Sequence, residues 1–181
     1  MSNTAPISYS PTWAGDDRVA PPLAGGERET LVACLDHARR TFELKCLGLT
    51  AEQLSTKAVP PSALSLHGLV RHLAGVERWW FRIQFAGEEL PLLHYTDDNP
   101  DSDFEDLDGD PELALQLWRE ECTVSRGIVA AATSLDQTGT RRRDGAAFSL
   151  RWLLCHHLEE YARHNGHADL LRERLDGRTG A

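Results

Sequence analysis

Residues 149–175 read SLRWLLCHHLEEYARHNGHADLLRERL, and this stretch predicts one long helix that Ser149 caps and Gly177 ends. Steps of four and three residues along one face connect Leu153, His157, Glu160, His164, His167 and Leu171. The central members of this stripe are polar and titratable. Apolar residues flank the stripe, namely Leu150, Leu154, Tyr161, Ala168 and Leu171. The pattern therefore indicates that titratable side chains face the interior of a helical protein.

Buried carboxylates and imidazoles need partners, because leaving them unpaired costs several kcal/mol. Glu160 and His164 lie one turn apart and can aim at one point. A divalent metal would satisfy both side chains, since imidazole and carboxylate are ordinary ligands of zinc. A third ligand must then come from another segment, and the candidates are His37, His67, His72 and His94. His72 is the best of these, because it lies in the middle of a predicted helix on its apolar face.

Two other interpretations stay open from the spacing alone. The stripe could face water, with Glu160 and His164 forming a pair on the helix surface. His72 could be a hydrogen-bonded residue of the core or its boundary rather than a metal ligand.

Three further helices are predicted, with apolar residues at helical spacing, over residues 27–46, 66–86 and 111–133. Ser65 caps the second of these helices and Gly87 ends it. The run Asp110-Pro111-Glu112 is typical of a helix start. Strand signals are nearly absent. Four helices of about 20 residues predict an all-α protein built as a four-helix bundle.

The predicted connections between the helices are about 18, 24 and 15 residues long, whereas simple up-and-down bundles use about 2–8. At least one connection is therefore expected to cross over, so that two consecutive helices run parallel.

Residues 97–110, which we call the acidic connection, invite comparison with a calcium-binding loop. With Gly109 at the sixth position of such a loop, the first ligand would be Phe104, which cannot coordinate. We interpret the acidic connection as a solvated loop.

Composition limits the partners of the chain. Its 181 residues include 19 Lys+Arg and 28 Asp+Glu, a net charge of −9, which disfavours binding to nucleic acid or to an anionic membrane. Apolar runs are far shorter than the roughly 20 residues that span a bilayer. The run Arg141-Arg142-Arg143 is interpreted as a solvated loop. Four scattered cysteines and no secretory signal predict a cytoplasmic protein without nucleic-acid or membrane partners.

The two ends of the chain differ from its centre. Residues 1–25 hold four prolines and predict an irregular arm that Trp13 anchors. Residues 26–176 form the predicted helical domain, and residues 177–181 form a short C-terminal tail.

Two stretches carry a resemblance to a known family. Residues 65–81, SLHGLVRHLAGVERWWF, resemble the second helix of the DinB superfamily. Residues 159–167, EEYARHNGH, resemble its fourth-helix signature, in which a histidine precedes x-Gly-Gln. The resemblance covers residues 25–175 and is closest to an actinobacterial branch similar to mycothiol-dependent maleylpyruvate isomerase.

The resemblance implies a fold and a metal site. The fold is an antiparallel four-helix bundle with up-down-down-up order and long connections. The metal is held by three side chains, which match His72, Glu160 and His164 in this chain. Many members have histidine where this chain has Glu160, and His167 stands where the signature has glutamine. His157 and His167 are then alternative ligands or residues that orient the ligands.

The resemblance also implies a function. Similar proteins use a low-molecular-weight thiol such as mycothiol in S-transfer or isomerisation of a small-molecule substrate. Zinc suits a thiolate, and nickel, iron and manganese are compatible with the same ligands. The aromatic run of residues 79–81 would line the pocket or pack in the core. Paired bundles are common in similar proteins, so a homodimer is one expected state. The alternative function is a non-catalytic metal- or ligand-binding protein, such as a sensor or a stress-associated protein.

Overall fold

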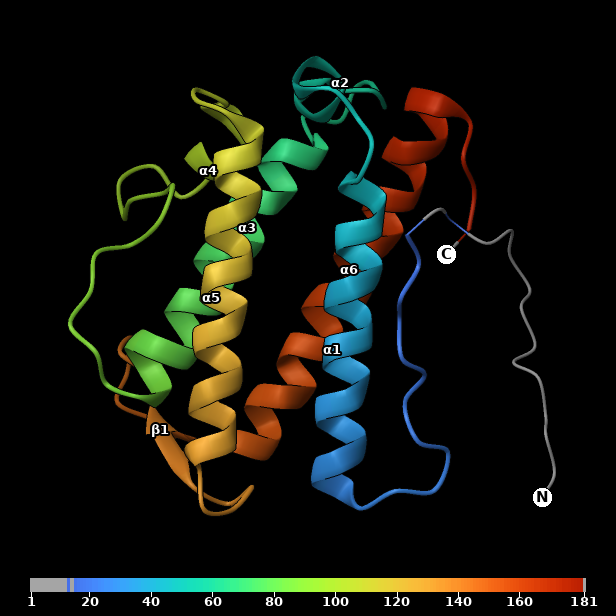
Figure 1. Cartoon of the computed structure of the whole chain (residues 1–181). Coiled ribbons are helices and arrows are strands. Elements are labelled where there is room, and N and C mark those ends of the chain that lie inside the picture. The colour runs from blue at the N-terminus through green and yellow to red at the C-terminus, as the bar shows by residue number, and fades with distance from the viewer. Residues whose placement is uncertain (1–12, 14, 181) are drawn as a thin grey trace, which may run out of the picture.

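The computed structural model describes residues 13 and 15–180, and this part of the chain is mostly helical, which confirms the predicted class. Four long helical segments build it, namely α1 (Glu27–Cys46), α3 (Leu66–Glu77) with its continuation η1 (Arg78–Phe85), α5 (Pro111–Ala131) and α6 (Leu150–Asp176). In Figure 1, α1 and α6 run in one direction and α3 and α5 run in the other. The most extensively packed pairs are α1 with α6 and α3 with α5. Within the described residues, every helix is too short or too polar to cross a membrane.

The ends of these helices follow from their capping residues. The Ser65 hydroxyl accepts a hydrogen bond from the Gly68 backbone N–H at 3.1 Å and so caps α3. Asp110 caps α5 and Ser149 caps α6 in the same way. Gly177 ends α6 with a φ of 78°, a left-handed conformation that favours glycine. The predicted helix boundaries therefore agree with the observed ones to within about two residues.

The connections contain structure that the helical periodicity did not predict. They hold two short helices and an antiparallel hairpin, namely α2 (Ala51–Ser55), α4 (Ser102–Glu105), β1 (Thr138–Thr140) and β2 (Ala147–Ser149). Each strand has only three residues, too few for an alternating pattern to appear in the sequence. Gly139 of β1 lies against η1, where a Cβ would come within 2.6 Å of the Phe85 Cα. The hairpin can therefore pack on η1 only with glycine at this position.

The second long helix is not uniform along its length. Its last part, η1, is a π-helix, in which each hydrogen bond reaches back five residues instead of four. The Ala86 N–H accordingly donates to the Phe81 carbonyl at 2.9 Å. Apolar spacing alone predicted a single α-helix over residues 66–86, so the π-helical part is a correction to that expectation.

The acidic connection is only partly solvated, which also corrects the expectation. Ser102 and Asp103 of α4 are buried, with 8% and 2% of their surface exposed. Arg71 of α3 donates hydrogen bonds to the backbone carbonyls of both residues at 3.2 Å. Phe104 lies against Gly68, where a Cβ would come within 3.2 Å of the Phe104 Cα. The acidic connection is therefore docked on α3 through α4.

Part of the predicted N-terminal arm lies outside the described residues, namely residues 1–12 and 14. Trp13 is buried, as expected for an anchor. Three cationic side chains lie over its ring, with Lys45 Nζ at 4.6 Å from the ring centroid, Arg172 Cζ at 4.9 Å and Arg178 Cζ at 5.6 Å. Trp13 thus ties the arm to the ends of α1 and α6.

A buried polar network crosses the apolar core and joins all four long segments. Arg39 of α1 donates two hydrogen bonds to the Glu77 carboxylate of α3, at 2.8 and 2.7 Å. The Tyr161 hydroxyl of α6 donates to Glu77 at 2.8 Å and accepts from Trp118 Nε1 of α5 at 2.9 Å. Burial acts to raise the pKa of Glu77, but Arg39 and the other partners outweigh it and lower that pKa to about 2. Glu77 is therefore an anion in the centre of the protein.

Candidate metal centre

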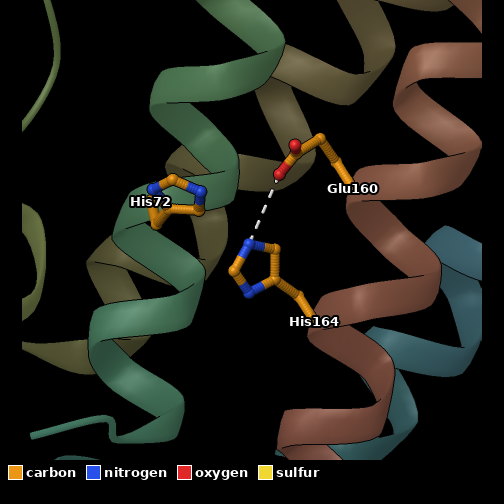
Figure 2. Close-up of side chains that lie close together, drawn as sticks. All are labelled: His72, Glu160 and His164. Atoms are coloured by element: carbon orange, nitrogen blue, oxygen red, sulfur yellow. Dashed lines mark ion pairs between the residues drawn. The ribbon is translucent and has the colours of Figure 1, made fainter.

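Two helices bring three of the predicted ligands together. His72 comes from α3, and Glu160 and His164 come from successive turns of α6 (Figure 2). Each offers one ligand atom, and these atoms all lie within 4.8 Å of one another. The cluster is inside the seam between the helices, since the side chains of His72, Glu160 and His164 are 23%, 13% and 8% exposed. The structure therefore agrees with an inward-facing stripe rather than with a stripe that faces water.

The charges of the α6 pair suit metal binding. His164 Nε2 lies 3.4 Å from Glu160 Oε2. Hydrogen bonding from His164, aided by Arg163 and His156, lowers the pKa of Glu160 to about 2 in spite of partial burial. Burial is the main cause that lowers the pKa of His164. Near pH 7, Glu160 is thus an anion and His164 favours the neutral ring, which are the forms that bind metals.

His72 is held from the side that faces away from α6. Its Nδ1 lies 2.8 Å from Oδ2 of the buried Asp103. The Phe104 ring stacks on the imidazole, with centroids 4.8 Å apart. Nε2 of His72 then faces Glu160 and His164 (Figure 2). Asp103 was not among the predicted site residues, because no local spacing connects it with a histidine that lies 31 residues earlier.

His157 and His167 lie on the predicted stripe but do not join the cluster. His167 Nδ1 is 3.3 Å from Nδ1 of His164. His167 therefore contacts the ring nitrogen of His164 that does not face Glu160. His157 is completely buried beside Phe81, with ring centroids 4.4 Å apart, and its Nδ1 lies 3.2 Å from the Leu153 carbonyl. His157 is therefore a core residue in this structure.

The other histidine candidates also lie elsewhere. His67 Nδ1 is 3.0 Å from the Ser55 hydroxyl, and His37 Nδ1 is 3.1 Å from the Val19 carbonyl. His94 belongs to the connection before α4, where burial lowers its pKa to about 4. Within the described residues, the one three-residue cluster with metal-binding geometry contains none of these three.

The aromatic run of residues 79–81 divides between core and surface. Phe81 is fully buried and packs in the core. Trp80 packs edge-on against His156, with ring centroids 4.7 Å apart. Trp152, which is 43% exposed, stacks on the same His156 at 4.9 Å. An aromatic cluster therefore continues along the seam between η1 and α6, one helical turn before Glu160.

The burial of His157 predicts a dependence of stability on pH. Burial lowers its pKa to about 4, against an ordinary value of 6.5, although the Glu77 carboxylate favours the charged ring. Between these values the unfolded chain binds a proton that the folded protein does not. The free energy of unfolding therefore has its full value above pH 6.5. It falls by about 3 kcal/mol as the pH is lowered towards 4.

Urea unfolding followed by circular dichroism at pH 7, 6, 5 and 4 would measure this loss. The H157Q variant, with a side chain that does not titrate, is expected to lose about 3 kcal/mol less than the wild type over the same range. Parallel pH profiles for the two proteins would show that His157 is not the group responsible.

The donor set fits a divalent metal. Two imidazoles and one carboxylate are a known set for catalytic zinc, which leaves a fourth position for another ligand. Tetrahedral bonds of about 2.0–2.1 Å place ligand atoms about 3.4 Å apart. The His164–Glu160 separation of 3.4 Å already matches that spacing. The ligand atom of His72 lies within 4.8 Å of the other two.

The chain is thus a mostly helical protein whose second and last long helices hold a candidate three-ligand metal centre. A family model described as mycothiol-S-transferase matches residues 30–177. The chain therefore belongs to the mycothiol-S-transferase family, which is DinB-like, and the predicted membership of the DinB superfamily is confirmed. A search of curated proteins found no match.

Proposed function

We propose that the protein is a metal-dependent enzyme that uses mycothiol, or a similar low-molecular-weight thiol, for S-transfer or isomerisation of a small molecule. The observation that carries this proposal is the convergence of His72, Glu160 and His164 in a chain of the mycothiol-S-transferase family. Zinc is the proposed metal because the donors are nitrogen and oxygen and the cosubstrate is a thiol. Nickel, iron and manganese are the alternatives for the same site.

Each part of the site has a proposed task. When bound, the metal would lower the pKa of the thiol and so favour the nucleophilic thiolate near pH 7. His72, Glu160 and His164 would hold the metal on one side and leave another side open to the thiol. The hydrogen bond from His164, with the ion pair to Arg163 at 2.9 Å, lowers the pKa of Glu160 and so favours its ionised form. His167 contacts His164 and would help to fix the orientation of its ring.

We also propose that residues 26–176 form one DinB-like four-helix bundle with up-down-down-up order. The opposite directions of α1 and α6 against α3 and α5 support it, as does the long second connection (Figure 1). The start of α1 at Glu27 and the end of α6 at Asp176 support these domain limits. Residues 1–25 would then be an arm and residues 177–181 a tail outside the bundle.

Elemental analysis of the untagged protein by plasma mass spectrometry tests the proposed metal site. The wild type is expected to hold about one zinc ion per chain, because three ligands in one cluster bind a single ion. The H72A/H164A variant is expected to hold almost none. Circular dichroism would show that the variant keeps its helices.

Two results would change the proposed function. A wild-type protein that stays metal-free after incubation with excess zinc would contradict it. A protein that binds one metal ion but neither binds mycothiol nor consumes it with any electrophile would support the alternative, a non-catalytic metal-binding protein.

A further inference from the structure

We propose that Asp103, in the acidic connection, is a positioning residue for the metal centre and fixes the orientation and tautomer of His72. This role rests on the proposed function, because it concerns a ligand of the proposed metal. It gives the acidic connection a part in the site, although this segment is far from the ligands in sequence.

The contact between Asp103 and His72 is direct and buried. Asp103 Oδ2 lies 2.8 Å from His72 Nδ1, and the aspartate side chain is only 3% exposed. The other carboxylate oxygen, Oδ1, is also buried and has no hydrogen-bond partner among the described residues. A buried carboxylate without partners is costly, so the bond to His72 is the main polar contact that the described chain offers this side chain.

The chemistry of the pair decides which nitrogen of His72 can bind a metal. A carboxylate oxygen accepts hydrogen bonds, so the 2.8 Å contact with Asp103 Oδ2 suits a His72 ring that carries its proton on Nδ1. In that tautomer the lone pair lies on Nε2, which faces Glu160 and His164 (Figure 2). A carboxylate behind a histidine ligand fixes its tautomer and raises its basicity, and loss of such a partner typically weakens metal binding about 10–100-fold.

The fold holds Asp103 in place from several sides. Arg71, one residue before His72, donates hydrogen bonds to two backbone carbonyls of α4 at 3.2 Å. Phe104, the next residue after Asp103, stacks on the His72 ring. Gly68, one turn earlier on α3, leaves room for the Phe104 backbone. A four-residue helix is thus locked to the same turn of α3 that carries the ligand.

Zinc affinity of three variants tests the role of Asp103. We would measure it by competition with a chromogenic chelator in D103A, D103N and D106A. D103A is expected to bind zinc about 10–100-fold more weakly than the wild type. D103N should lose less, because its amide oxygen still accepts from Nδ1–H. D106A is the matched control: Asp106 is an exposed carboxylate of the same segment, and its removal should leave the affinity unchanged.

The tautomer of His72 gives a second readout that needs no metal and no activity. Nitrogen-15 NMR of the metal-free protein distinguishes Nδ1–H from Nε2–H, and the H72A spectrum identifies the resonance. The wild type and D103N are expected to show Nδ1–H, whereas D103A should shift towards Nε2–H. A residue that only stabilised the fold would lower the melting temperature without changing the tautomer.

The outcomes separate this role from the proposed function. Wild-type zinc affinity in D103A would overturn the role of Asp103 and leave the proposed function standing. An Nε2–H tautomer in the wild type would overturn the role even if D103A did not fold. Failure of the wild type to bind zinc would overturn the proposed function, and the role with it, while the NMR result would still report on the contact.

Discussion

Replacing Glu77 with glutamine is expected to lower the free energy of unfolding by about 3–5 kcal/mol, because it removes the buried carboxylate that pairs with Arg39. The guanidinium then keeps only the ion pair with Asp36, a carboxylate that is 38% exposed. Both side chains are almost inaccessible, with 3% of Arg39 and none of Glu77 exposed. The substitution also weakens the acceptor of the Tyr161 hydroxyl. Urea unfolding at pH 7, followed by circular dichroism, would measure the loss.

Two further variants separate lost charge pairing from lost packing. The double variant R39M/E77L removes both charges and keeps similar volumes, so it should recover much of the stability that E77Q loses. R40M breaks ion pairs of the same helix with Glu43 and with the largely exposed Asp17, and it removes a hydrogen bond to the Gly15 carbonyl. These contacts lie near the surface, so their loss should cost clearly less than the loss in E77Q. A double variant as unstable as E77Q would show that the hydrogen-bonded network, rather than the unpaired charge, carries the effect.

Removing His164 is expected to abolish metal-supported thiol transfer, with a fall in kcat/KM of at least about 100-fold. In H164A the two remaining side chains, His72 and Glu160, lie on different helices and do not make a three-ligand site. The measurement is mycothiol-dependent turnover of a fluorogenic electrophile, with metal content determined on the same samples.

His167→Ala is the matched control for this prediction. His167 lies three residues further along α6 and contacts His164, but it is not part of the cluster. H167A should keep about one metal ion per chain when the metal is in excess, because all three proposed ligands remain, and its activity should fall less than that of H164A, because only an orienting contact is lost. Equal loss of metal in H167A and H164A would contradict the proposed ligand set and return His167 to the candidates.

The long helices were predictable because their signals are local. Apolar spacing places residues 27–46 on one helix, and cap residues such as Ser149 and Asp110 specify the starts of two others within a few positions. The hairpin and α4 were not predictable in this way. Their three- and four-residue segments depend on contacts with α3 and η1, which the local pattern does not contain.

The residues of the candidate site also differ in whether their signal is local. Glu160 and His164 share one helix, so a spacing of four residues was enough to pair them. The place of His72 on the apolar face of its helix ranked it first among four histidines, whereas its proximity to Glu160 and His164 depends on how α3 packs on α6. Asp103 could not be found from spacing, since its contact with His72 depends on how α4 docks. His157 shows the converse: it lies on the titratable stripe, and the helix turns its side chain into the core beside Phe81.

The π-helical segment η1 bears on how relatives of this chain should be compared. Its wider turn takes up one residue more than an α-helical turn, so side chains after Glu77 are rotated from the positions that a uniform helix would give them. A relative with a regular α-helix in place of η1 would need one residue fewer to cover the same segment beside the hairpin. Its alignment to this chain would then need a single-residue gap between residues 78 and 85. A gap placed outside that interval would match Trp80 and Phe81 with residues that occupy other faces of the helix.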